Sequence, residues 1–300
     1  MTEPLEALQK YVHFLREHDG VRQVRLTRDA QRGLDRLAAA VKAFPEPVQN
    51  RGMPTGEPVR PSAVSPKVAV AGSATVSSQA PSGINDPPLE ITGSSKAEQL
   101  RHLAERASVC VKCPHLVARR HNVVFGVGDP EAKLMFVGEA PGEDEDLKGE
   151  PFVGRAGQLL TKMIVAMGLS REQVYIANIV KCRPDMPPGV SGNRKPTKQE
   201  METCVPYLRA QIEVIKPSVM VALGATAVEG LFGPVGTIGS LRGKFLEYRG
   251  TPLMPTYHPS YLLRNQSNTE KRKVWEDLLK VMERLAMPIS EKQRNFFLSR

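Results

Sequence analysis

From residue 96 onward, short apolar runs alternate with longer segments in which apolar residues recur every three or four positions. The apolar runs predict four buried strands, at residues 134–137, 175–180, 219–223 and 253–257. Segments between them, such as residues 159–167, have the spacing of amphipathic helices. Because strands that alternate with helices favour a parallel sheet covered on both faces, we predict an α/β fold. Its three layers, α/β/α, would enclose a central, mainly parallel four-stranded sheet.

Capping signals set the ends of several predicted helices. Thr197 and Glu200 form a capping box that opens a helix, and Pro217 follows its end. A helix is also predicted at about residues 98–107. Asn268 is expected to cap the last helix of the domain.

The first 95 residues have a different composition. Residues 1–44 carry apolar residues at helical spacing and predict a helical N-terminal extension, which would pack on itself or dock onto a protein partner. Residues 45–95 contain nine prolines and no aromatic residue, so they predict a disordered Pro/Gly/Ser-rich linker. Residues 96–286 would form the folded domain, and residues 287–300 a C-terminal tail.

The net charge of the chain indicates which kind of partner it binds. The chain carries a formal net charge of +9, and residues 97–300 hold 29 Lys and Arg against 22 Asp and Glu. This excess favours a polyanionic partner, although it also aids solubility. No apolar run approaches the roughly 18 residues of a membrane span, so no membrane partner is expected. Acidic residues near the start argue against a signal peptide, and we expect a cytoplasmic monomer.

Four cysteines are candidates for a metal site. Cys110 and Cys113 form a C-x-x-C pair, whereas Cys182 and Cys204 lie on separate predicted elements. Four thiolates can hold either zinc or a [4Fe–4S] cluster, and the spacing alone does not choose between them. The alternative is an isolated C-x-x-C with two buried, inert thiols.

Unusual loops follow three of the predicted strands, at residues 138–142, 178–183 and 258–264. Ligands bind at the carboxyl ends of the strands in parallel sheets, so these loops predict one shared site. Each loop also has a plain structural interpretation, as a turn, a capping amide or a satisfied histidine.

The loop motifs together resemble a known family. Gly-Glu-Ala-Pro-Gly at 138–142, Pro-Phe-Val-Gly at 151–154, Asn-Ile-Val-Lys-Cys at 178–182 and His-Pro-Ser-Tyr-Leu-Leu-Arg at 258–264 appear in that order. With the cysteines, they resemble the family 4 uracil-DNA glycosylases, the iron–sulfur branch of that superfamily, over roughly residues 100–285. The resemblance implies a monofunctional DNA repair enzyme that removes uracil from single- or double-stranded DNA and leaves an abasic site.

The resemblance also implies a cofactor and catalytic residues. The four cysteines would ligate a [4Fe–4S] cluster. His258 would donate to uracil O2, where negative charge develops as the bond breaks. Glu139 would orient water or stabilise the sugar cation. Glu145 is a second candidate carboxylate, which would otherwise shape the pocket against the methyl group of thymine.

Further residues are implied in binding uracil. Phe152 would stack on the base, and Asn178 would read its polar edge. Ala140 and Gly142 belong to the loop at the scissile bond. They replace an aspartate and a tyrosine of the family 1 enzymes, so water activation and thymine exclusion need other residues.

On the DNA side, Leu262 or Leu263 would fill the space that the flipped nucleotide leaves. The resemblance implies that Asn193 is the loop asparagine of the family and binds DNA. Arg264 is also expected to contact DNA. The expected phosphate contacts are Arg183, Arg194, Lys195, Arg242, Lys244 and Arg264.

Two alternatives stay open. The segment 183–196 is longer than is usual in the family, and a related subfamily has an insertion here whose histidine becomes covalently linked to DNA. Because this segment has no histidine, we predict turnover rather than trapping. From another class, the chain would be a non-catalytic, metal-stabilised DNA-binding module.

Overall fold

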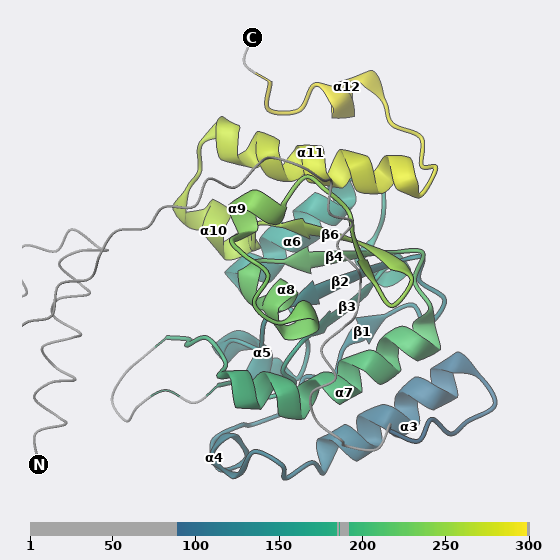
Figure 1. The fold of residues 1–300 in the computed structure, drawn as a ribbon, viewed down its shortest axis with the longest axis vertical. Helices are drawn as coiled ribbons and strands as arrows, with labels where there is room; N and C mark the ends of the chain where they lie inside the picture. The colour runs from purple at the N-terminus through teal and green to yellow at the C-terminus, as the bar shows by residue number, and fades with distance from the viewer. Residues whose placement is uncertain (1–88, 185, 187–191, 299–300) are drawn as a thin grey trace, which may run out of the picture. The chain divides into compact units, whose positions relative to one another are not determined.

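One mixed β-sheet forms the centre of the domain (Figure 1). The structure is a computed structural model that describes residues 89–184, 186 and 192–298. The predicted extension 1–44, and residues 45–88 of the predicted linker, lie outside the described residues. No helix within the described ranges combines the length and the apolar character needed to cross a membrane.

The sheet contains the four predicted strands at its centre. These are β2 (Leu134–Gly138), β3 (Tyr175–Asn178), β4 (Val219–Leu223) and β6 (Thr251–Thr256), which run parallel to their neighbours in the order β3-β2-β4-β6. The predicted strand number was wrong, because the described sheet has six strands. Antiparallel β1 (Val127–Gly128) pairs with β3 at one edge, and β5 (Leu246–Tyr248) pairs with β6 at the other. Both edge strands are too short for a period of two to be visible in the sequence.

Helices cover both faces of the sheet, which confirms the three layers. Alternate strand residues point to opposite faces: Met135 and Val137 join one core cluster, and Leu134 and Phe136 join the other. The first face is covered by α3 (Lys96–Ser108), α7 (Lys198–Ile215) and α8 (Ala225–Phe232). The second is covered by α6 (Arg155–Ala166), α10 (Pro259–Arg264) and α11 (Asn268–Arg284).

Short helices occupy several connections. They are α4 (Pro114–Val117), α5 (Glu143–Lys148), the 3-10 helix η1 (Arg171–Gln173), α9 (Ile238–Leu241) and α12 (Glu291–Arg294).

The predicted capping box at the start of α7 is present. The Thr197 hydroxyl accepts from the Glu200 backbone N–H at 3.2 Å, and the Glu200 carboxylate accepts from the Thr197 N–H at 2.7 Å. Lys216 adopts a left-handed conformation that ends the helix before Pro217. At α11 the prediction was wrong by one residue, because Ser267 rather than Asn268 caps that helix.

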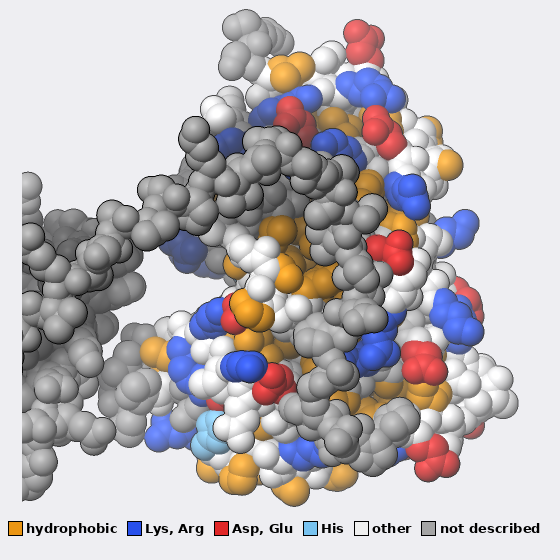
Figure 2. Space-filling model, viewed as in Figure 1, with side chains coloured by type: hydrophobic (Ala, Val, Ile, Leu, Met, Phe, Trp, Pro, Cys, Tyr) orange, Lys and Arg blue, Asp and Glu red, His pale blue; other side chains and the backbone are white. Residues whose placement is uncertain are grey.

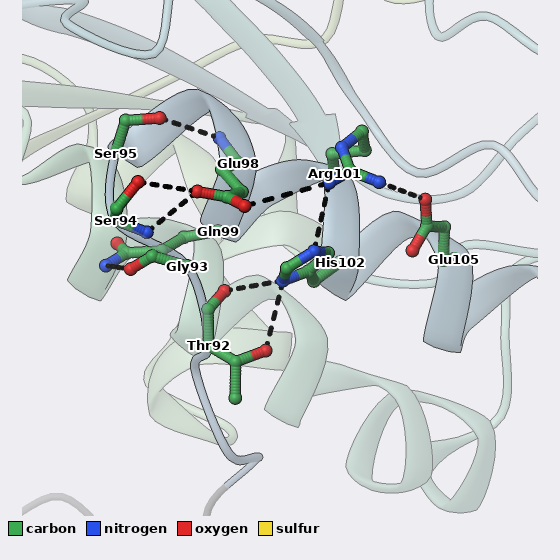
Figure 3. A network of polar contacts seen from close by, with 9 residues as sticks. All are labelled: Thr92, Gly93, Ser94, Ser95, Glu98, Gln99, Arg101, His102 and Glu105. Carbon is green, nitrogen blue, oxygen red and sulfur yellow. Dashed lines mark hydrogen bonds and ion pairs between the residues drawn. The ribbon is translucent and has the colours of Figure 1, made fainter.

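The folded region begins earlier than the predicted boundary at residue 96. Leu89 and Ile91 pack against the core cluster under α3 and α7. Figure 3 shows the polar contacts that follow: Ser95 caps α3, and the Glu98 carboxylate accepts from the Ser94 backbone N–H at 2.8 Å. These contacts fix the direction of α3, the helix that leads to the C-x-x-C turn.

The end of the described chain also packs on the domain. The indole Nε1 of Trp275 donates to the carbonyl of Gln293, and the Gln293 side chain donates to the carbonyl of Ala166 at 2.9 Å. The Phe296 ring lies 5.2 Å from the Trp275 ring. The segment predicted as a C-terminal tail therefore braces α6 and α11 as far as it is described.

A buried ion pair joins α11 to the connection before β5. The Asp277 carboxylate is fully buried and accepts from Arg242 at 2.9 and 3.0 Å and from the Thr256 hydroxyl at 2.7 Å. Burial raises the pKa of Asp277, while the Thr256 and Arg242 contacts oppose that shift. Arg242 thus has a structural role in this ion pair, and its contact with phosphate stays a prediction.

Replacing Asp277 with Asn is expected to lower the free energy of unfolding by about 3 kcal/mol, because Arg242 is left buried without its counter-charge. The neighbouring Glu276→Gln change is the control. Glu276 makes a half-exposed pair with Arg272, so we expect a change within about 0.5 kcal/mol. Urea unfolding of both variants measures the difference, and equal stabilities would contradict the structural role of the Asp277 pair.

Candidate active site

The carboxyl ends of β2, β3, β4 and β6 open into a cavity of about 500 Å³. Most of the predicted site residues line it, namely Glu139, Ala140, Gly142, Glu145, Phe152, Asn178, Asn193, His258 and Arg264. Sequence reasoning missed Ala156, Ala225 and Ser260, which also line the wall. Small residues at helix starts carry no signal in a single sequence, because their role depends on what packs beside them.

Asn178 ends β3 at the base of this cavity and is 2 % exposed. Within the described residues its side-chain Oδ1 has no hydrogen-bond partner. Gly138 lies opposite it on β2, where a Cβ would stand 2.4 Å from that oxygen and 2.5 Å from the Phe152 ring. The missing side chain of Gly138 therefore lets the amide and the ring approach each other. A buried amide oxygen without a partner is costly, which points to a ligand that satisfies it.

Phe152 presents its ring to the cavity from a strained backbone. Its φ of 54° lies in the left-handed region that few non-glycine residues adopt. The Arg171 guanidinium donates to the carbonyl of Pro151, just before this residue. A Cβ on Gly157 would stand 1.9 Å from the Phe152 carbonyl carbon, so only glycine fits there. The Phe152 ring lies 5.6 Å from the His258 ring, and the two form adjacent walls of the cavity.

Glu145 holds the same segment in place. One carboxylate oxygen accepts from the backbone N–H groups of Val153 and Gly154, each at 2.9 Å, and the other accepts from Gly142 at 3.0 Å. These three bonds engage both oxygens of the side chain. The contacts support a positioning role for Glu145 rather than the alternative of activating water.

His258 caps α10, and its protonation state follows from that contact. The ring Nδ1 accepts from the Ser260 backbone N–H at 3.1 Å, and the Ser260 hydroxyl lies 2.8 Å away. Because a backbone N–H can only donate, the neutral ring carries its proton on Nε2. Burial lowers the pKa of His258 to about 4, and the charge of Arg264 adds to the shift. The imidazole is therefore neutral at physiological pH.

Glu139 follows β2 and is half-buried in the cavity wall. Burial raises the pKa of this carboxyl group, while a hydrogen bond with Thr226 and the charge of Lys195 lower it and Glu229 raises it. Lys195 forms an ion pair with Glu229. The Glu139 carboxyl group therefore lies at the cavity without forming a close ion pair of its own among the described residues.

The predicted leucines are not brought into the cavity. Leu262 is 5 % exposed and belongs to the core cluster with α6 and α11. Leu262 and Leu263 instead line a second, apolar cavity of about 560 Å³. Helical periodicity explains this placement, because Ser260 and Arg264 are four residues apart and share the other face of α10. The described conformation therefore presents Arg264, rather than a leucine, at this rim.

Several predicted phosphate contacts are engaged within the protein. Arg183 lies 3.6 Å from Glu143, and Arg194 pairs with buried Glu200 at 2.6 Å. Burial alone would raise the pKa of Glu200, but hydrogen bonds from Arg194 and His115 lower it to about 2. Arg264 and Lys244 are exposed. On the face shown in Figure 2, basic and acidic side chains are interspersed.

The four cysteines lie on one side of the sheet. Cys182 belongs to the core cluster under α3 and α7, and Cys110, Cys113 and Cys204 pack against it. Burial, reinforced by the charges of the other cysteines, raises the thiol pKa of Cys113, Cys182 and Cys204, in the last case to about 12. As described here, the chain shows no group of three or more His, Cys, Asp or Glu side chains already gathered to hold a metal ion.

Known proteins match this arrangement. The model of the uracil DNA glycosylase superfamily matches residues 125–279. The chain is 47 % identical to a type-4 uracil-DNA glycosylase of Thermotoga maritima, over 62 % of this chain and 94 % of that protein. It is 41 % identical to the type-4 enzyme of Archaeoglobus fulgidus, over 60 % and 93 %. A type-5 uracil-DNA glycosylase of Pyrobaculum aerophilum is 30 % identical, over 59 % and 88 %.

The α/β fold, the cavity at the carboxyl ends of the strands and the sequence matches all indicate the same family. The chain belongs to the uracil DNA glycosylase superfamily and, within it, to the type-4 family. This confirms the resemblance that the loop motifs carried.

The buried His258 is expected to make stability depend on pH. Unfolding returns its pKa from about 4 to the ordinary value of about 6.5. Below pH 6.5 the unfolded chain therefore binds a proton that the folded protein excludes, so stability falls as pH falls. The contribution is about 2 kcal/mol between pH 7 and pH 5. Urea unfolding at these two pH values should show a smaller difference for His258→Asn than for the unchanged protein; identical differences would contradict the buried, neutral state.

Proposed function

We propose that this protein excises uracil from DNA by hydrolysing the N-glycosidic bond, leaving an abasic site for base excision repair. The observation that carries the proposal is the unpartnered amide oxygen of Asn178 beside the Phe152 ring in the cavity. A planar base between this amide and the two rings would satisfy the buried oxygen. Uracil inside a duplex is inaccessible, so the nucleotide must first rotate out of the helix, at a cost of a few kcal/mol.

Asn178 supplies the discrimination that stacking lacks. Phe152 would stack on any base, because every base has a π-face. The Asn178 amide can accept from uracil N3–H while donating to O4, whereas cytosine presents the reversed pattern. A mismatched base would leave these buried groups unpaired, so rejection can be strong.

His258 and Glu139 act on the two charges that bond cleavage separates. Negative charge develops on uracil, and the neutral imidazole can donate its Nε2 proton as a hydrogen bond to O2. Positive charge develops on the sugar, and the Glu139 carboxylate in the cavity wall is the candidate to stabilise it or to orient water. Glu145 and Arg171 serve this chemistry indirectly, because they hold the backbone on either side of Phe152.

The cysteines fit a [4Fe–4S] cluster by the chemistry of the donor set. All four cysteines belong to or pack against one core cluster. N–H donors point at two of the sulfurs: the Lys181 backbone N–H at Cys204, 3.2 Å away, and the Arg120 guanidinium at Cys182, 3.3 Å away. Such hydrogen bonds are typical of thiolates that ligate iron. When bound, the cluster would cross-link the end of β3, α7 and the C-x-x-C turn, which is a structural contribution.

Replacing Asn178 with Ala is expected to lower kcat/KM for uracil release at least about 10³-fold, because the buried reader of the base is lost. Release of free uracil from single- and double-stranded oligonucleotides measures this, with thymine- and hypoxanthine-containing strands as specificity controls. Asn295→Ala, the same change at the exposed residue that follows α12, should retain full activity.

A denaturing gel of the same reactions separates the alternatives. Turnover predicts abasic product and no protein–DNA adduct, whereas a stable shifted band would identify a covalent-trapping relative. Binding without product would identify a non-catalytic DNA-binding module. Full activity of Asn178→Ala would show that the base is read elsewhere.

The purified protein is expected to be brown, with broad absorption near about 400 nm and about four iron and four sulfide per chain. Cys204→Ala should lose this absorption and a large part of the stability, because it removes one of the four proposed ligands of the cluster. A colourless protein with one zinc per chain would overturn the iron–sulfur assignment.

A further inference from the structure

A fully buried lysine lies directly behind the base-reading residue. Lys181 is 1 % exposed, and its side chain folds back along the chain so that Nζ donates to the main-chain carbonyl of Asn178 at 2.9 Å. Nζ also donates to the Gln211 side chain at 2.6 Å and lies 5.6 Å from the Phe125 ring centre. Among the described residues no carboxylate pairs with it. None of the steps above uses this side chain.

The contact fixes one peptide plane. The carbonyl of Asn178 is held by Lys181, and the N–H of the same peptide, from Ile179, donates to the Gly138 carbonyl at 3.0 Å. Both polar groups of this peptide therefore have hydrogen-bond partners in the buried interior. A shift of this peptide would change the backbone at Asn178, which sets the direction of its side chain beside Phe152.

Lys181 is itself held in position by a second layer. Gln211 is fully buried, and its Nε2 donates to the Phe125 carbonyl and to the Tyr175 hydroxyl, each at 3.0 Å. With both amide hydrogens engaged, its oxygen is left to face Lys181. The chain of contacts runs from the protein interior through Lys181 to the peptide that carries the base reader.

We propose that Lys181 is a positioning residue for uracil recognition, which fixes the Asn178 amide through the Asn178 main-chain carbonyl. This inference rests on the proposed function and extends it to a residue that does not touch the base. Without Nζ the buried carbonyl is an unsatisfied acceptor, and only the bond from the Ile179 N–H to the Gly138 carbonyl still holds the peptide. A displacement of about 1 Å at a reacting group is enough to lower a rate by about 10²-fold.

A double-mutant cycle tests whether Lys181 acts through the Asn178 side chain. Lys181→Met keeps the apolar stem and removes the donor, and is expected to lower kcat/KM for uracil release about 10–100-fold. In the Asn178→Ala background the same change should cost less than about threefold, because its target is already absent. A purely structural lysine would lower kcat/KM by the same factor in both backgrounds, and that result would overturn the proposal.

Two further variants sharpen the result. Lys181→Gln retains an N–H donor for the Asn178 carbonyl, so its kcat/KM should lie between those of the unchanged protein and Lys181→Met. If Lys181→Met does not fold, Lys181→Gln replaces it in the double-mutant cycle. Its effect on kcat/KM should again be smaller in the Asn178→Ala background than in the unchanged protein. Asp277→Asn is the matched control, since it disturbs a buried network, with Arg242 and Thr256, that does not include Asn178. Its effect should be equal in both backgrounds.

Metal content and uracil binding separate the remaining explanations. Because Lys181 precedes Cys182, iron per chain is measured for each variant, and variants are compared at equal content. Inhibition by free uracil should weaken in Lys181→Met, whereas unchanged inhibition would contradict positioning of the reader. If the unchanged protein releases no uracil, the proposed function itself fails; if it does and the cycle is additive, only the role of Lys181 fails.

Discussion

The parallel pairing of β2 with β3 places Gly138 beside Asn178, and the cavity depends on this contact. A side chain on Gly138 would collide with both the Asn178 amide and the Phe152 ring. The proposed polar reader, Asn178, and the proposed stacking wall, Phe152, thus share a space that exists only because one strand ends in glycine. The rest of the loop at residues 139–142 follows from that point and carries Glu139 into the cavity wall.

Several carboxylates of the domain hold backbone groups or counter-charges instead of facing a substrate. Glu145 secures the segment after Phe152, Glu200 anchors the loop that carries Asn193, and Asp277 pairs with Arg242. Among the groups that line the cavity, the Asn178 oxygen, the His258 Nε2 proton and the Glu139 carboxyl group are the ones that the proposed function uses. Preorganisation of this kind keeps reacting groups in place without a rearrangement at the moment of reaction.

Prediction from the sequence succeeded for features that depend on local residue patterns and failed for features that depend on tertiary packing. The four inner strands and the loops at their ends were predictable, because buried parallel strands leave uninterrupted apolar runs. The edge strands β1 and β5 leave no such signal. The burial of Leu262 and Arg242 was not predictable for a shared reason: a residue type states which chemistry is possible, but its burial depends on helices distant in sequence.

The sequence by itself determined the α/β class, the shared edge of the site and the family, since periodicity and ordered motifs are local properties. Only the tertiary structure decided which groups are free to act. The low pKa of His258, the engagement of Glu145 and the contact of Lys181 with the Asn178 carbonyl all arise from burial and from partners on other elements. The basic excess shows the same limit, because several of its members are neutralised by carboxylates that only the fold brings near.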